Sequence, residues 1–506
     1  MHIPLRRVLA CAATAALAAG GLAAGTAQAA TTSTAAAPAK RLVDDFNGDG
    51  YRDVVVNLPM HRTSSLVNSG AVLVLYGSAS GLSSTHRKLI TQATTGVPGT
   101  PEALDWWGDD TTTGDYDGDG YADLAVSGPG EDITSGGTTD ENAGQVTLIW
   151  GGPDGLTKHG ATTAKLGTTT DTHLQTGSDL VSGDFNGDGK QDLVVGTRGT
   201  RETGAVALGP ITRTGTPASV KPLGLDPGIS WADPMVAAGD LTGDGVTDLL
   251  VSWTTGTLEP TDKIHVLRGG AGGFTDAGYL KDATGNPLNH REGSPLAVGD
   301  LDHDGRADVV VPQPEKLNYK GQFVVVYGGT NGQDATRKPV TFHQDTPGVP
   351  DSNSDVGTDL FADDVTVGDV NGDGYGDVIA ASPAENHSNL TNPGKVTVLR
   401  GGPGGLTGTG ATAFTQSTSG VPGVPLADGS FGMGVKAVDV NGDGRSDALI
   451  GVAGVDEAGV NAVDGGLYTL PGSSTGTTGT GAKEFTPTAL GIPAGSALRL
   501  GTSFNH

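Results

Sequence analysis

The sequence predicts an all-β fold, a seven-bladed β-propeller made of four-stranded antiparallel blades. Three observations lead to it. One acidic nine-residue pattern occurs seven times, short runs typical of β-strands flank each copy, and no segment after residue 40 has the period of a helix. Because one open sheet does not hold that many strands, they must be divided among several small sheets.

The repeated pattern is Asp-x-Asp/Asn-x-Asp-Gly-x-x-Asp, with Thr242 at position 3 of the fourth copy. Successive copies are 70, 69, 56, 60, 69 and 70 residues apart, and they begin at Asp45, Asp115, Asp184, Asp240, Asp300, Asp369 and Asp439. One structural unit per spacing fills the chain, as in other repeat proteins.

The sixth unit shows the expected strands most clearly. Residues 365–368 lead into the acidic loop and 378–381 leave it, a third apolar run follows at 395–399, and a more polar run at 413–416 closes the unit. Four short antiparallel strands per unit are typical of a propeller blade.

The two ends of the chain are predicted to meet. The first acidic loop follows directly after residues 41–44, whereas residues 500–504 begin an eighth copy. We expect the C-terminal segment to dock beside residues 41–44 and complete the first blade, which would remove exposed sheet edges.

The acidic loops have the donor pattern of calcium sites. Carboxylates at positions 1, 3 and 5 of a tight loop, a backbone carbonyl at 7 and a carboxylate at 9 supply the oxygens that a hard cation needs. The glycine at position 6 permits the positive φ that wraps the loop. The predicted ligands are Asp45, Asn47, Asp49, Asp53, Asp115, Asp117, Asp119, Asp123, Asp184, Asn186, Asp188, Asp192, Asp240, Thr242, Asp244, Asp248, Asp300, Asp302, Asp304, Asp308, Asp369, Asn371, Asp373, Asp377, Asp439, Asn441, Asp443 and Asp447.

Up to seven calcium ions are therefore expected, with a structural role. The loops hold 23 of the 57 acidic residues, and crowded carboxylates about 4 Å apart repel one another by a few kcal/mol when no cation is bound. We expect the fourth loop to bind most weakly, since Thr242 offers only a hydroxyl. The alternative is a set of Asp-Gly hairpin turns with solvated acids, which seven copies in register disfavour.

The N-terminal residues are typical of a secretory signal. Arg6 and Arg7 precede an alanine-rich apolar run and the small-residue site at 27–29, which predicts a signal peptide at 1–29, a disordered linker at 30–40 and the propeller at 41–506. An uncleaved anchor and twin-arginine export are the alternatives to cleavage and the general secretory route. The only cysteine is Cys11, so the mature chain offers no disulfide and no thiolate ligand.

The charge restricts the partners. The formal net charge is −27, or −29 after loss of Arg6 and Arg7, which disfavours nucleic acid and anionic membranes. No stretch after the leader is long and apolar enough to enter a bilayer. We expect a secreted, extracellular monomer.

These loops resemble FG-GAP repeats, the units of the integrin α-subunit propeller and of secreted bacterial integrin-like proteins. The last unit matches best, with Phe431-Gly432 followed by the loop from Asp439 to Asp447, and the second has Trp107-Gly108 before its loop. The resemblance implies seven blades with calcium in the loops that join the first two strands of a blade, on one face. The aromatic-glycine opening is expected only in the second and seventh units, since the fourth and fifth have Trp231-Ala232 and Glu292-Gly293.

The predicted function is non-catalytic binding of an extracellular protein or glycan, such as adhesion. A lectin-like propeller is the first alternative, with Trp106, Trp107, Trp231 and Trp253 as sugar platforms, although a tryptophan in a blade usually packs in the core. A polysaccharide lyase or hydrolase is the second. The histidines lack zinc-hydrolase spacing, and Ser474 in Gly-Ser-Ser-Thr-Gly lies in a Gly/Ser/Thr-rich tract rather than at a strand-to-helix turn.

Overall fold

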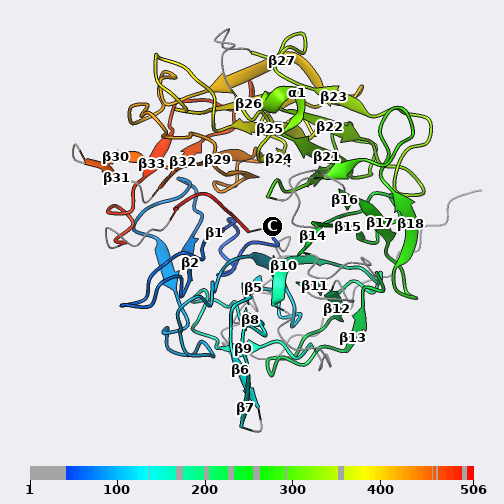
Figure 1. Ribbon diagram of the computed structural model, residues 1–506, viewed down its shortest axis with the longest axis vertical. Coiled ribbons are helices and arrows are strands. Elements are labelled where there is room, and N and C mark those ends of the chain that lie inside the picture. The colour runs from blue at the N-terminus through cyan, green and yellow to red at the C-terminus, as the bar shows by residue number, and fades with distance from the viewer. Residues whose placement is uncertain are drawn as a thin grey trace, which may run out of the picture. The chain divides into compact units, whose positions relative to one another are not determined.

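Seven small antiparallel sheets follow one another along the chain and form a ring (Figure 1). The computed structural model describes residues 42–505 apart from position 136 and the segments 167–174, 199–203, 226–232, 255–261, 291–292, 351–357, 458–459, 463–464 and 493–498. All blades belong to the compact unit Lys40–His506. The predicted leader and linker lie outside the described residues. The seven-bladed all-β fold is confirmed.

Each blade repeats one strand order along the chain. Blades 1 to 3 contain β1 (Val54–Leu58), β2 (Ala71–Leu75), β3 (Arg87–Ile90); β4 (Thr111–Gly114), β5 (Asp123–Gly128), β8 (Gln145–Ile149), β9 (Ala161–Thr163); and β10 (Thr176–Gly183), β11 (Asp192–Thr197), β12 (Gly204–Leu208), β13 (Ser219–Pro222). Blades 4 and 5 contain β14 (Asp233–Gly239), β15 (Asp248–Thr254), β17 (His265–Arg268), β18 (Thr275–Tyr279); and β20 (Ala297–Gly299), β21 (Asp308–Gln313), β22 (Gln322–Val326), β23 (Val340–Phe342). Blades 6 and 7 contain β24 (Val365–Gly368), β25 (Asp377–Ser382), β26 (Lys395–Arg400), β27 (Thr407–Phe414); and β28 (Val435–Val438), β29 (Asp447–Val452), β32 (Gly466–Leu470), β33 (Lys483–Phe485).

Additional short elements lie in the connections between strands. They are the hairpins β6 (Ile133–Ser135) with β7 (Thr138–Asp140) and β30 (Val455–Glu457) with β31 (Val460–Ala462), the pair β16 (Asp262–Lys263) with β19 (Asn289–His290), and α1 (Lys316–Tyr319). Three of the four residues of α1, Leu317, Asn318 and Tyr319, have positive φ angles, so it is a tight turn rather than a regular helix. Within the described ranges, no helix is long and apolar enough to cross a membrane.

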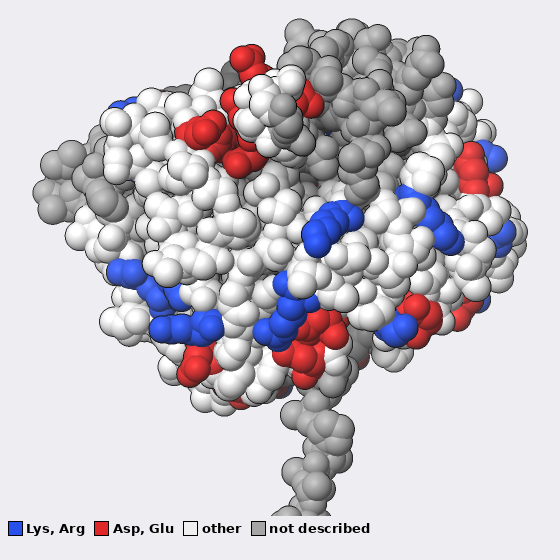
Figure 2. Space-filling view, turned by 90° about the horizontal axis from the view of Figure 1, so that it is seen from below, with Lys and Arg blue, Asp and Glu red and all other residues white. Residues whose placement is uncertain are grey.

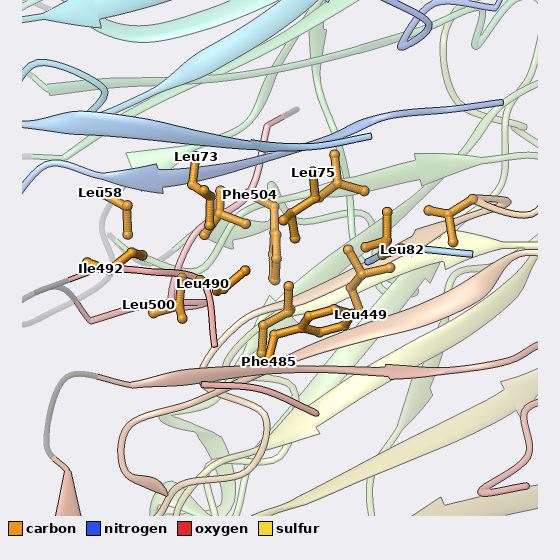
Figure 3. Close-up of a cluster of buried hydrophobic side chains, with 14 of the residues drawn as sticks. Leu58, Leu73, Leu75, Leu82, Leu449, Phe485, Leu490, Ile492, Leu500 and Phe504 are labelled. Carbon is orange, nitrogen blue, oxygen red and sulfur yellow. The ribbon is translucent and has the colours of Figure 1, made fainter. Parts of the chain in front are cut away.

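The hydrophobic core is divided among the interfaces between blades. Alternate residues of a strand point to opposite faces of its sheet, so Val54 and Val56 of β1 pack against blade 7 while Val55 packs against blade 2. Seven such clusters occur among the described residues, one between each pair of neighbouring blades. Figure 3 shows the cluster between blades 7 and 1. Both faces of each blade are thus buried against a neighbour.

Close backbone contacts also join one blade to the next. Gly70, before β2, has a φ of +81° and pairs with Trp107 of blade 2, where an added Cβ would lie 2.0 Å from the Trp107 carbonyl oxygen. Gly321 pairs in the same way with Phe361 of blade 6, a fully buried residue that the sequence reasoning missed. Such aromatic residues therefore open blades 2, 6 and 7, the last with Phe431.

Polar side chains link blades at two further levels. Near the ring centre, an aspartate directly before or within the first strand of a blade accepts a backbone N–H from the following blade. The pairs are Asp110 with Leu180 (2.6 Å), Asp179 of β10 with Val236 (2.7 Å) and Asp364 with Val435 (2.8 Å). Near the outer strands, a glutamine before a Gly-Val-Pro turn donates to the following blade: Gln92 to Glu131 (2.6 Å), Gln344 to Glu385 (2.5 Å) and Gln416 to the Tyr468 hydroxyl (2.9 Å).

The C-terminal segment contacts blade 1, whose sheet otherwise has three strands. Phe504 forms an antiparallel bridge with Val56, and Ser503 accepts a hydrogen bond from the Asn57 N–H at 3.1 Å. The segment runs beside β1 toward the ring centre (Figure 1). Contact with the predicted segment 41–44 is made by Asp44, which accepts from the Asn505 amide at 3.3 Å. We propose that this pairing closes the ring.

Phe504→Ala should destabilise the propeller if this pairing closes the ring. Phe504 is buried among leucines of blades 1 and 7 (Figure 3), and loss of a core phenylalanine costs about 3 kcal/mol. Chemical denaturation would measure the free energy of unfolding. Tyr319→Ala is the control, because that side chain is 49% exposed. Equal stability of the two variants would contradict closure by this segment.

Candidate metal centres

All seven acidic loops occupy the same connection in their blades. Each lies directly before the second strand of the blade pattern, and in blades 2 to 7 it follows the first strand. Because the blades repeat one strand order, the loops share one face of the propeller. Neighbouring loops are joined there: the N–H at position 8 of one loop donates to the carbonyl at position 1 of the preceding loop, as Ala122 does to Asp45 (3.0 Å) and Ser446 to Asp369 (2.7 Å).

The first aspartate of each loop organises the turn. In the first loop, one carboxylate oxygen of Asp45 accepts from the N–H of Gly48 (2.7 Å) and the other accepts from that of Gly50 (2.8 Å). The same two bonds recur in the third, fourth, sixth and seventh loops. These bonds curl the backbone around one side of the carboxylate, and Gly50 adopts the positive φ of +91° that the pattern predicts.

The last aspartate of each loop is a buried link between loop and blade. Asp53 is 0% exposed; one oxygen accepts from the Phe46 N–H (2.9 Å) and the other from the N–H of Gly77, the second residue after β2 (3.0 Å). The equivalent pairs are Asp123 with Gly151, Asp192 with Gly209, Asp248 with Gly269, Asp308 with Gly328, Asp377 with Gly401 and Asp447 with Gly472. Sequence reasoning assigned position 9 only to metal binding. The sequence contains a signal for this structural role, because a glycine follows shortly after the third predicted strand of every unit. The position has no room for a side chain: a Cβ on Gly77 would lie 2.3 Å from the Arg52 carbonyl oxygen.

Burial disfavours the ionised form of these last aspartates when no cation is bound. It raises the pKa of Asp53 and Asp123 to about 8, that of Asp308 to about 7 and those of Asp192, Asp377 and Asp447 to about 6. Backbone N–H donors oppose the shift in the pKa of Asp53, whereas the charges of Asp45 and Asp49 add to it. A bound cation would reverse this balance by favouring the charged form.

Metal-stripped protein should therefore become less stable as the pH rises. Between the ordinary pKa of 3.8 and about 8, the folded state holds protons on Asp53 and Asp123 that the unfolded state has released. The contribution of these protonated groups to the free energy of unfolding is therefore full below pH 3.8. It decreases toward pH 8 by about 1.4 kcal/mol per group per pH unit. The melting temperature of dialysed, chelator-treated protein should be higher at pH 5.5 than at pH 8. A melting temperature that rises with pH in that range would contradict the burial effect.

Two of the loops bring three carboxylate oxygens close together. One oxygen from each of Asp115, Asp117 and Asp123 lie within 4.8 Å of one another, as do oxygens of Asp300, Asp302 and Asp304. Only these two loops and no others have aspartate at position 3; the rest carry Asn47, Asn186, Thr242, Asn371 and Asn441 there. The donor chemistry fits calcium: carboxylate and amide oxygens in a flexible loop. In the fourth loop the Thr242 hydroxyl instead faces Asp240 at 3.4 Å.

Comparison with known proteins gives the same repeats. Residues 184–251 match the FG-GAP-like repeat family, and residues 107–149 and 361–399 match the FG-GAP repeat family. The chain is an FG-GAP, integrin-like β-propeller. The three matches span blades 2, 3, 4 and 6, and Phe361 opens the last of them.

The propeller is similar to parts of several longer proteins. Integrin alpha-V of Gallus gallus is 27% identical over 244 residues, which cover 43% of this chain and 23% of the relative. Integrin alpha pat-2 of Caenorhabditis briggsae is 28% identical over 42% of this chain and 17% of its own length. Phosphatidylinositol-glycan-specific phospholipase D of Bos taurus is 29% identical over 32% of this chain and 19% of its own. The chain thus spans less than a quarter of these relatives.

Solved structures give weaker likenesses. An Agrocybe aegerita lectin that recognises non-reducing terminal N-acetylglucosamine has 16% identity and a TM-score of 0.38, over 72% of this chain and 81% of its own. A Bacillus licheniformis rhamnogalacturonan lyase has 12% identity and a TM-score of 0.27, over 93% and 98%.

The tryptophans and the serine considered for other chemistry lie in different surroundings where the structure describes them. Trp107 is 1% exposed and packs between blades 1 and 2, so it is a core residue and not a sugar platform, whereas Trp106 is half-buried. Trp231 lies outside the described residues, and Trp253 lies in β15. Ser474 is in an exposed turn between β32 and β33, without the strand-to-helix geometry of a nucleophile elbow.

Proposed function

We propose that this FG-GAP propeller is an extracellular calcium-binding protein that presents a surface to another protein, without catalysis of its own. The observation that carries the proposal is the set of seven acidic loops in one structural position, two of which bring three aspartate oxygens within 4.8 Å.

The residues at positions 1, 3, 5 and 9 would hold the ion in each loop. Bound calcium would supply positive charge that lets crowded carboxylates approach one another. The chain itself already fixes the ends of each loop, because Asp45 gathers backbone N–H groups and Asp53 ties the loop to Gly77. Calcium would therefore stabilise a turn whose ends are already fixed. The blades would then keep their relative positions when a partner protein binds to their surface.

Apolar residues exposed on the connections away from the loops support a protein partner. Val67 in the β1–β2 connection and Leu104 before β4 are 42% and 48% exposed and adjoin, since the Leu104 N–H donates to the Val67 carbonyl at 2.9 Å. Leu317 and Tyr319 of α1, in the β21–β22 connection, are 46% and 49% exposed. Contiguous exposed apolar side chains, rather than single ones, mark protein-binding surfaces, so the support comes from residues that adjoin. The similarity to integrin alpha chains is consistent with this role.

Equilibrium dialysis of the full-length protein against calcium tests the metal part of the proposal. We expect a stoichiometry that approaches seven and falls by one in Asp115→Asn. Retention on arrays of extracellular proteins and of glycans, with calcium and with chelator, tests the binding part. Selective retention on proteins supports the proposal, selective retention on glycans favours a lectin, and new reducing ends or released lipid in a substrate panel would show an enzyme. Absence of bound calcium at millimolar concentration would refute the metal part.

A further inference from the structure

Two loops carry one carboxylate more than the others. The second loop has aspartate at positions 1, 3, 5 and 9, as does the fifth, whereas the remaining loops have Asn or Thr at position 3. The extra aspartates, Asp117 and Asp302, have side chains only 10% and 8% exposed. A nearly buried carboxylate beside three others requires a counter-charge.

Each extra carboxylate meets an arginine. Arg213 donates from Nε to Asp117 (2.6 Å) and from Nη2 to Asp119 (2.7 Å), so one guanidinium bridges positions 3 and 5 of the second loop. Arg337 donates from Nη1 to Asp302, position 3 of the fifth loop. In the first and sixth loops the Asn amide at position 3 makes the corresponding bond to position 5, at 3.0 and 2.8 Å. An aspartate cannot donate this bond. In the second loop Arg213 donates to position 5 instead, and in the fifth loop Arg306 donates to Asp304, while Arg337 pairs with position 3.

The two arginines come from different places in the repeat. Arg213 lies in the β12–β13 connection of blade 3 and reaches back to the loop of blade 2, whereas Arg337 lies in the β22–β23 connection of the same blade as its loop. Both face the aromatic residue that follows the third strand of the loop's blade: Arg213 is 5.8 Å from the Trp150 ring centre and Arg337 is 3.1 Å from that of Tyr327. The two arginines come from different connections of the repeat, yet both pair with the carboxylate at position 3. We infer that the extra negative charge, and not the repeated sequence pattern, determines where they lie.

Other basic residues on this face pair differently. Lys190, Arg306 and Arg445, each at position 7, form an ion pair with the position-5 aspartate of their own loop, whose side chain is 38–43% exposed. Arg306 also donates from Nε to the Thr242 carbonyl oxygen of the fourth loop at 3.3 Å. Figure 2 shows basic side chains beside acidic ones on the surface of the propeller. Such exposed pairs contribute little. Arg400 approaches position 9 of the sixth loop, Asp377, at 3.4 Å. Arg213 and Arg337 alone, among the described residues, pair with a position-3 carboxylate.

We propose that Arg213 and Arg337 are built-in counter-ions that lower the calcium affinity of the second and fifth loops. The inference rests on the proposed calcium binding. Each guanidinium occupies carboxylate oxygens that a cation would use, and its positive charge repels the ion. At the four ligand positions, four carboxylates and one arginine give the same formal charge as the three carboxylates of the loops with Asn or Thr. These two loops, which have the most carboxylates, would otherwise bind calcium most tightly.

Terbium luminescence tests the proposal at the second loop of the full-length protein. Terbium substitutes for calcium, and excitation through Trp150, whose ring lies under Arg213, reports on this loop; Trp150→Phe and Asp115→Asn should each abolish that signal. We expect Arg213→Gln to lower the half-saturating terbium concentration about tenfold. Arg213→Lys, which keeps the charge, should shift it far less. Arg62→Gln removes an exposed charge from the β1–β2 connection and should leave it unchanged.

The outcomes distinguish the proposed role of Arg213 from the proposed calcium binding. Unchanged or weaker terbium binding in Arg213→Gln, with wild-type binding intact, would overturn the role of the arginine and leave the calcium sites standing. Absence of terbium and calcium binding in the wild type would overturn both. Calcium competition for the terbium signal, about tenfold more effective in Arg213→Gln than in the wild type, is the expected confirmation.

Discussion

Removal of calcium should lower the melting temperature of the propeller by roughly 20 °C. At free calcium a hundred times above the dissociation constant, each occupied loop contributes about 2.7 kcal/mol to folding, and up to seven loops contribute. The unfolding entropy of a chain with about 465 folded residues is roughly 1 kcal/mol per degree, which converts that sum to the stated shift. Thermal unfolding followed by circular dichroism, first with excess calcium and then with chelator, is the measurement.

Reversal by added calcium is part of the expected result, because all the donors of a loop lie within nine residues of one chain. Magnesium at the same concentration is the control. Magnesium demands strict octahedral geometry at shorter distances, so it should restore much less. A melting temperature that ignores chelation would mean that the carboxylates are balanced by the arginines, by protons on buried aspartates and by solvent alone.

Asp53→Ala should cost about 4 kcal/mol even in the presence of chelator. The substitution leaves the N–H groups of Phe46 and Gly77 buried without an acceptor, and each such group costs about 1–3 kcal/mol. A small cavity adds to this loss. The free energy of unfolding from denaturant titration in chelator isolates the structural role from metal binding.

Asp49→Ala in the same loop is the matched control. Asp49 is exposed and its carboxylate accepts bonds only within the loop, so its loss should cost less than 1 kcal/mol in chelator. With calcium present, both variants should lose the ion from this loop. Equal destabilisation of the two variants in chelator would show that position 9 acts only through metal.

Much of this fold could be predicted because its repeat has fixed positions. The acidic pattern marks one strand boundary in each blade, and the apolar runs around it have the length and alternation of strands. The same pattern predicts which donors lie close together in the second and fifth loops, since all four donors of a loop lie within nine residues. Local spacing is sufficient where a site is made from one turn.

Contacts between distant segments could not be predicted in the same way. Arg213 meets Asp117 across 96 residues, and nothing in the neighbourhood of either residue indicates the pairing. Gln92 and Glu131 belong to separate repeats whose relative placement follows only from the ring. Phe361 was missed because alanine follows it instead of the expected glycine. Ala362 nevertheless adopts a positive φ of +64°, as Gly108 and Gly432 do after the other two aromatic residues.

The division of the core among seven interfaces has a consequence for folding. A single blade has no hydrophobic core within itself, because the apolar side chains on each of its faces pack against a neighbouring blade. To open the ring at one place costs one interface, but to release one blade costs two, and the remaining blades then expose two apolar faces. The free energy needed to unfold one blade is therefore larger than that blade's share of the residues would suggest. The ring as a whole, rather than the single repeat, is the unit that unfolds cooperatively.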